Sequence, residues 1–243
     1  MPIGVIINAC SVVIGGAVGA VAGNKLSMDF KDKLNMIFGA CSMGMGISTI
    51  VLMQNMPAVI FSVIIGTAFG LAIHFGDRIN VAAKGMQKLM SKFIKVDNSK
   101  IPEEDFIATL VTCIVLFCAS GTGIYGSIVS GMTGDHSILI AKSILDLFTA
   151  LIFACSLGAV VSIVAIPQFV IFLLLFLLAG FIYPLTNDTM IADFKACGGF
   201  IMLATGFRMI KVKMFPVADM IPSMIIVMPL SYFWVSTILP LVS

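Results

Sequence analysis

Long apolar runs separated by short polar segments set the pattern of this sequence. Most runs hold about 20 residues, the length that an α-helix needs to cross about 30 Å of hydrocarbon. They do not alternate between apolar and polar positions in the units of about ten residues that are typical of membrane barrel strands. The pattern therefore predicts an all-α, polytopic transmembrane protein of about eight spans. The spans are expected at residues 2–23, 34–53, 57–75, 105–130, 137–165, 168–185, 196–212 and 216–240.

Composition indicates the same class. Hydrophobic residues make up 60% of the chain, the mean hydropathy is +1.13, and only 11% of residues are charged, whereas a soluble domain carries about 25% charged residues. This composition excludes a soluble globular enzyme and a nucleic-acid-binding protein. The six cysteines lie inside or at the edge of the spans, with no C-x-x-C pair and no histidine at metal-ligand spacing. We interpret them as packing residues and expect neither a metal nor a cofactor.

The basic residues are distributed unevenly between the two sides of the predicted spans. Short positively charged loops stay on the cytoplasmic side of a membrane, and twelve of the fourteen basic residues fall on one side. We therefore expect a bacterial inner-membrane protein whose two termini face outward. The twelve residues are Lys25, Lys31, Lys33, Arg78, Lys84, Lys88, Lys92, Lys95, Lys100, Arg208, Lys211 and Lys213.

Two segments of the chain are similar at a fixed offset of 164 residues, namely 29–46 and 193–210, and both begin with D-F-K. The second segment opens five crossings after the first, so the two copies would run in opposite directions. Inverted repeats of this kind are found in secondary transporters, while chance similarity is the alternative. The repeat predicts an N-terminal three-span repeat (1–76), an interfacial helix and linker (77–100), a central two-span hairpin (101–166) and a C-terminal three-span repeat (167–243).

Glycines interrupt several of the predicted spans. Helices broken at matching positions of two repeats mark a midplane binding site in transporters, but glycine also permits two helices to pack closely, and both interpretations stay open. In the first span, Gly15, Gly19 and Gly23 form two G-x-x-x-G steps that favour packing against another span of the same chain over packing against a second protomer. The glycines expected in broken-helix segments are Gly39, Gly44, Gly46, Gly121, Gly123, Gly198, Gly199 and Gly206.

Residues 77–96 have the pattern of a helix that lies in the lipid headgroup layer. Ile79, Ala83 and Met86 fall on one face of this helix, continued by Met90 and Phe93. Four lysines at positions 84, 88, 92 and 95 fall on the opposite face. We predict that this segment contacts anionic lipid, with a regulatory or nucleotide-binding role for the lysines as the alternative.

The segment "TGDHSILIAKSILDL" (133–147) places four charged or titratable residues at the start of the fifth span. On a helix, Asp135, Lys142, Ser143 and Asp146 share one face. Each charge at the centre of a membrane helix costs about 2.5 to 3.5 kcal/mol, and such residues usually mark ion, proton or substrate pathways. An ion pair between Lys142 and Asp146 that only braces the fold is the alternative, and His136 is either a cap or a proton carrier.

The chain resembles a family of bacterial membrane proteins. The resemblance covers essentially the whole chain and rests on "IGVIINACSVVIGGAVG" near the N-terminus and on "GSIVSGMTGDHSILIAKSILD" in the centre. These stretches are similar to those of the YdfK/YqgA-like integral membrane proteins, grouped as DUF554. Asn8, Gly134, Asp135, His136, Lys142, Ser143 and Asp146 match the family pattern. The resemblance supports the fold and this choice of residues, and it implies no particular substrate.

These patterns favour a secondary transporter of a small polar or charged solute or of an ion. In this hypothesis Asp135 and Asp146 bind a cation or carry a coupling proton, Lys142 pairs with Asp146 when the site is empty, and Asn8 and Ser143 supply neutral hydrogen bonds. No nucleotide-binding motif or catalytic triad is found in the sequence, so we expect no ATPase activity and no enzyme. A homo-oligomeric channel lined by the same residues is the main alternative, and a membrane scaffold or membrane-embedded enzyme is the weaker one.

Overall fold

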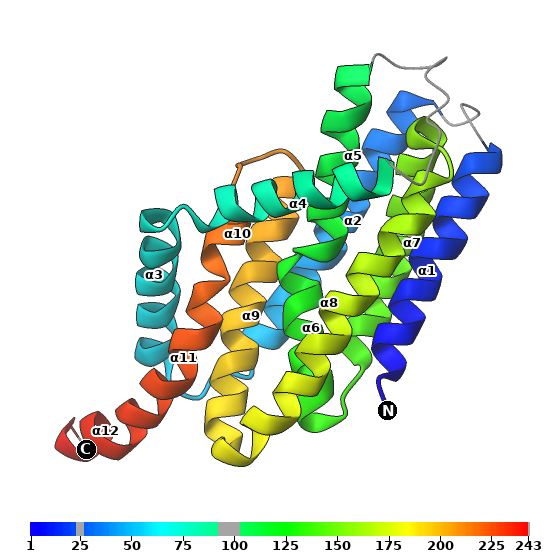
Figure 1. Ribbon diagram of the computed structural model, residues 1–243. Helices are drawn as coiled ribbons and strands as arrows, with labels where there is room; N and C mark the ends of the chain where they lie inside the picture. The colour runs from blue at the N-terminus through cyan, green and yellow to red at the C-terminus, as the bar shows by residue number, and fades with distance from the viewer. Residues whose placement is uncertain (23–26, 92–102, 243) are drawn as a thin grey trace. The chain divides into compact units, whose positions relative to one another are not determined.

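The computed structural model describes residues 1–22, 27–91 and 103–242, and these ranges contain helices and no strand. Six helical runs in them are long and apolar enough to cross a membrane, and counting the bent pair α3 and α4 as one span raises the number to seven. The predicted all-α fold is confirmed, and the predicted number of about eight spans is approximately consistent with these six or seven. The helices are α1 (Ile3–Ala22), α2 (Met28–Ile50), α3 (Met56–Ala72), α4 (Phe75–Ser91), α5 (Glu103–Cys118), α6 (Gly121–Thr133), α7 (Ser137–Leu157), α8 (Val160–Ile182), α9 (Asp188–Met209), α10 (Val217–Met220), α11 (Pro222–Phe233) and α12 (Leu239–Val242), with short helices η2 (Tyr183–Leu185) and η3 (Trp234–Ile238) (Figure 1).

The chain divides into two compact units. Unit 1 consists of Met1–Asn35 and Asp77–Leu178, and unit 2 consists of Met36–Gly76 and Ala179–Ser243. This division differs from the four predicted segments (1–76, 77–100, 101–166 and 167–243), because α1 packs against α7 of the central hairpin and falls in a different unit from α3.

In unit 1, α1 and α7 lie side by side and run parallel (Figure 1). A Cβ atom added at Gly15 would lie 2.1 Å from the carbonyl oxygen of Leu147, and one added at Gly19 would lie 2.2 Å from that of Leu151. Only glycine permits so close an approach of the two backbones. The predicted packing of the first span against another span of the same chain is therefore confirmed at these two glycines.

In unit 2, α2 and α9 pack in opposite directions through glycines. Gly39 faces Gly206, Gly46 faces Gly199, and the hydroxyl of Ser42 donates to the carbonyl oxygen of Met202 at 2.9 Å. Both helices are continuous at Gly39, Gly44, Gly46, Gly198, Gly199 and Gly206, so the broken segments predicted there are wrong. The glycines that face the other helix instead allow the two backbones to come close. Each helix stays intact at these glycines because packing against its neighbour offsets the conformational entropy that glycine loses in a helix. The antiparallel direction agrees with the predicted orientation of the two segments, but the inverted repeat itself stays a prediction.

The helix of the fourth span is interrupted next to the predicted glycines, although the run Thr109–Thr133 still counts as one membrane-length span. Helix α5 ends at Cys118 and α6 begins at Gly121, where the Ser120 hydroxyl caps α6 by accepting a hydrogen bond from the backbone N–H of Gly123 at 3.1 Å. A further break separates α7 from α8 at Gly158, whose φ of 75° is in the left-handed region. The expected boundary between the fifth and sixth spans, at residues 165–168, was therefore about two turns too late.

Helix α4 has the predicted amphipathic character over the residues that the structure describes. Ala83 and Gln87 are buried, and Ala83 joins the apolar core of unit 1, whereas Lys84 and Lys88 are exposed. Phe93, Lys92 and Lys95 lie outside the described residues.

Candidate functional site

Helix α7 places a lysine and an aspartate one turn apart inside unit 1. The Lys142 ammonium and the Asp146 carboxylate form an ion pair, and their side chains are 4% and 9% exposed. Removing two such charges from water costs several kcal/mol for each ion before their attraction is counted. A pair of this kind must be surrounded by further polar groups, and the structure supplies them.

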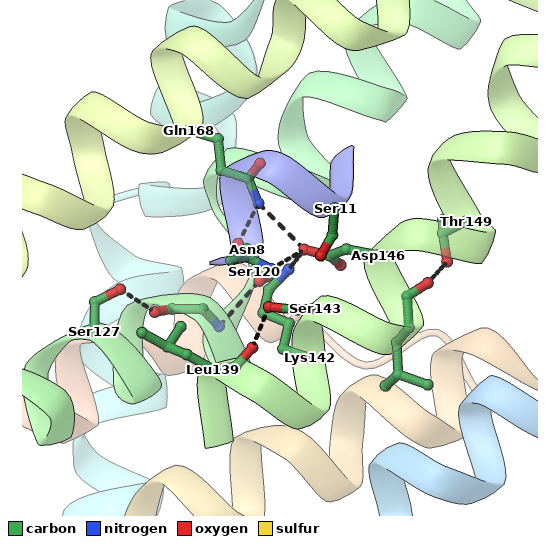
Figure 2. A network of polar contacts seen from close by, with 12 residues as sticks. Asn8, Ser11, Ser120, Ser127, Leu139, Lys142, Ser143, Asp146, Thr149 and Gln168 are labelled. Carbon is green, nitrogen blue, oxygen red and sulfur yellow. Dashed lines mark hydrogen bonds and ion pairs between the residues drawn. The ribbon is translucent and has the colours of Figure 1, made fainter. Parts of the chain in front are cut away.

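Two amide side chains from other helices complete the centre (Figure 2). Asn8 of α1 donates from Nδ2 to Asp146 Oδ2 at 2.8 Å, and Gln168 of α8 donates from Nε2 to the same oxygen at 3.2 Å and to Asn8 Oδ1 at 2.8 Å. Asn8 and Gln168 are completely buried. Three helices thus converge on one carboxylate oxygen, and we call Asn8, Lys142, Asp146 and Gln168 the Asp146 centre.

The local sequence explains why these side chains meet. The close contact of α1 with α7 at Gly15 and Gly19 brings Asn8, two turns before Gly15, within reach of Asp146. Helix α8 runs opposite to α1, since the Ser162 hydroxyl donates to Val13 O at 3.0 Å while Gln168, further along α8, bonds to Asn8, earlier in α1. The small residues of α1 thus position the polar groups of both neighbours.

Three other predicted site residues bond to groups outside this centre. Asp135 is exposed in the turn between α6 and α7, where its Oδ1 accepts from the backbone N–H of Ser137 at 3.0 Å. His136 directly precedes α7, with Nδ1 2.6 Å from the hydroxyl of Ser130. Ser143 is buried, but its hydroxyl donates to the carbonyl oxygen of Leu139, one turn earlier (Figure 2). The predicted polar stripe therefore reduces to Lys142 and Asp146, because α7 begins only at Ser137 and a buried serine bonds its own helix.

Of the two glycines predicted in the broken fourth span, Gly123 contacts the centre. A Cβ added there would lie 2.9 Å from Lys142 Cε and 2.1 Å from Phe172 Cζ. Gly121 only marks the start of α6. Within the described ranges, no group of three or more His, Cys, Asp or Glu residues is arranged to hold a metal ion.

Unit 2 contains a second buried aspartate, Asp193 of α9. Its Oδ1 accepts from the backbone N–H groups of Gln54 and Asn55, each at 2.9 Å. Its Oδ2 accepts from Asn55 Nδ2 at 2.9 Å and from the Ser231 hydroxyl at 2.6 Å. Four neutral donors therefore surround the completely buried carboxylate at the start of α3, where the helix dipole also favours negative charge.

The sequence interpretation missed Gln168, Asn55 and Ser231. The two asparagine–aspartate pairs have the same spacing in the sequence, since Asn8 and Asp146 are 138 residues apart and so are Asn55 and Asp193. Each asparagine donates from Nδ2 to Oδ2 of its aspartate. The single glutamine in an apolar span gave a second signal, since a buried amide requires partners.

Comparison with known proteins places the chain among membrane proteins. The family described as "Protein of unknown function (DUF554)" matches residues 3–232. The chain is 45% identical over 234 residues to the Escherichia coli (strain K12) "Uncharacterized protein YqgA", covering 96% of this chain and 98% of that protein. It is 24% identical over 223 residues to the Bacillus subtilis (strain 168) "Uncharacterized membrane protein YdfK", covering 92% and 93%.

No solved structure matches the chain. The membrane-protein relative and the membrane-length helices together identify a multi-pass integral membrane protein.

Proposed function

The chain belongs to the DUF554 family, and we propose that it is a secondary transporter that moves a small polar or charged solute, or an ion, through the Asp146 centre. One observation carries this proposal, namely a lysine and an aspartate that are buried in a membrane-length helix. Ionisable residues at such depth usually line the path of an ion, a proton or a substrate, because a purely structural role would be filled at lower cost by apolar packing.

The four residues of the centre have different roles in this proposal. Asp146 supplies the negative charge that binds a cation or a coupling proton. Lys142 neutralises Asp146 while the site is empty, which keeps an unpaired charge out of the apolar interior. Asn8 and Gln168 hold Asp146 Oδ2 in position through neutral hydrogen bonds. Asp135 has no role in binding here, because it is exposed and held in a turn.

We further propose the setting in which this transport takes place. The protein lies in a bacterial inner membrane with both termini outward, in line with the distribution of its basic residues. The exposed lysines of α4 contact anionic lipid headgroups. The carrier needs no cofactor and performs no covalent chemistry.

Electrical recording from proteoliposomes on a solid-supported membrane tests this function. Small amines, amino acids, carboxylates and monovalent cations are applied in concentration jumps to the wild-type protein and to the double variant Lys142→Met/Asp146→Asn. We expect a transient, saturable current for at least one compound, and no current in the double variant, which lacks both charges of the centre. A current that persists unchanged in the folded double variant, or no wild-type current across the panel, would contradict transport at this site. A sustained current that does not saturate would favour a channel.

A further inference from the structure

The surroundings of the Lys142 ammonium resemble a binding site for a cation. Its Nζ lies 5.9 Å from the ring centre of Phe117 and 5.8 Å from that of Phe172, over both rings. Both phenylalanines are completely buried. A desolvated cation over an aromatic face gains about 2 kcal/mol, so two rings and the Asp146 carboxylate together form a cage that suits an ammonium group.

The same centre contains an acceptor without a donor. Gln168 Oε1 is buried and is the one such side-chain atom in the described residues with no hydrogen-bond partner. The amide cannot simply be turned over, because its Nε2 donates to Asn8 Oδ1 and Asp146 Oδ2. This oxygen points away from Asp146 (Figure 2), so Gln168 contributes to the centre through its Nε2 alone.

The polar groups of the centre do not suit an anion. The Lys142 charge is already neutralised by Asp146, and the amide N–H groups of Asn8 and Gln168 point at the same carboxylate. What remains around the ion pair is the electron-rich faces of Phe117 and Phe172. Every remaining feature attracts positive charge.

We propose that the Asp146 centre binds a small primary ammonium compound, and that the Lys142 ammonium occupies the place of this substrate in the empty carrier. The substrate ammonium then pairs with Asp146 Oδ2 between Phe117 and Phe172, while the amides of Asn8 and Gln168 keep that oxygen in place. Lys142 must leave the cage as the substrate enters, because one carboxylate balances one cation. The proposal rests on the proposed transport function for its physiological meaning, whereas the binding itself is independent of transport.

The tight contacts at Gly123 limit the size of the substrate. An added Cβ at this position would already collide with Lys142 Cε and Phe172 Cζ, so the cage accepts a compact group. A quaternary ammonium carries no N–H for Asp146, and a potassium ion donates no hydrogen bond. Methylammonium is therefore the suitable probe, with tetramethylammonium and potassium as controls.

Binding of radiolabelled methylammonium to the purified protein in detergent tests the proposal. We expect saturable binding to the wild type that tetramethylammonium and potassium do not displace at equal concentration. Lys142→Met should bind at least tenfold more tightly, because the tethered competitor is gone. Gln168→Leu, in the presence of Lys142, should bind at least tenfold more weakly, while Thr149→Val, one turn further along α7 and bonded to Leu145 O, should bind like the wild type.

Absence of methylammonium binding in both the wild type and Lys142→Met would overturn the substrate class. Displacement by potassium as effective as by methylammonium would do the same. If Lys142→Met does not fold, the wild type and Gln168→Leu decide the question. Failure of the substrate class is distinguishable from failure of transport, since the recordings above detect transport of any compound in the panel.

Discussion

Replacing Lys142 with methionine and Asp146 with asparagine, singly and together, measures how strongly the two charges of the centre depend on each other. Both side chains are at least nine-tenths buried, and removal of one partner from a buried ion pair costs about 3–5 kcal/mol because the other charge is left uncompensated. Methionine keeps the length of the lysine chain, and asparagine keeps an acceptor for Asn8 Nδ2. The double variant has no buried charge, so its free energy of unfolding should return to within about 1–2 kcal/mol of the wild type. The coupling free energy is therefore expected to be at least about 3 kcal/mol.

Equilibrium unfolding in mixed micelles, followed by the fluorescence of the single tryptophan, Trp234, gives these free energies. Asp29 and Lys33 provide a matched control, because they form an ion pair one turn apart on α2 at 2.8 Å with side chains that are 73% exposed. Their coupling free energy should be about 0.3–0.5 kcal/mol. A coupling at Lys142 and Asp146 no larger than that of the exposed pair would refute the argument that this pair is desolvated.

Three further predictions concern the framework around the centre. Gly15→Ala should lower the free energy of unfolding by about 1–3 kcal/mol, because the added methyl group overlaps α7. Gly44→Ala, with open space around the added Cβ, should be neutral or stabilising. Equal effects of the two substitutions on the free energy of unfolding would contradict the contact between α1 and α7. Asp193→Ala should destabilise by at least about 2 kcal/mol because four donors lose their acceptor, and an unchanged free energy of unfolding would show that these bonds contribute little. In a cysteine-free background, an impermeant thiol reagent applied from outside should label a cysteine at Ser243 and not one at Lys88, and the reverse labelling would invert the topology.

The length and apolarity of the spans could be predicted from the sequence because the membrane imposes them on each helix separately. The same local logic identified Lys142 and Asp146, since two charges in an apolar helix are conspicuous. It also identified the glycine contacts of α1. Each of these features is determined by residues that are close in sequence.

The partners of Asp146 could not be predicted in the same way. Gln168 is 22 residues from Asp146, and Asn8 is 138 residues away, so their convergence depends on how α1, α7 and α8 pack. The glycines of α2 and α9 show the converse limit, because glycine is compatible both with a broken helix and with a close helix contact. Only the neighbouring helix decides between the two.

Asp135 shows how a helix boundary changes a functional interpretation. Its spacing from Lys142 and Asp146 suits a common helical face, but α7 begins at Ser137 and leaves Asp135 in the preceding turn. The predicted span also began at residue 137, so the error was to extend its helical face two residues beyond its start. Transport should therefore be insensitive to its charge.

A comparison of Asp146→Asn with Asp135→Asn in the proteoliposome recordings tests the central claim most directly. The two substitutions remove the same charge, one inside the centre and one in the exposed turn, and both variants are compared at equal amounts of inserted protein. We expect Asp146→Asn to lose the substrate-induced current and Asp135→Asn to keep it. A current that survives in Asp146→Asn, or that disappears equally in both variants, would contradict transport through the Asp146 centre.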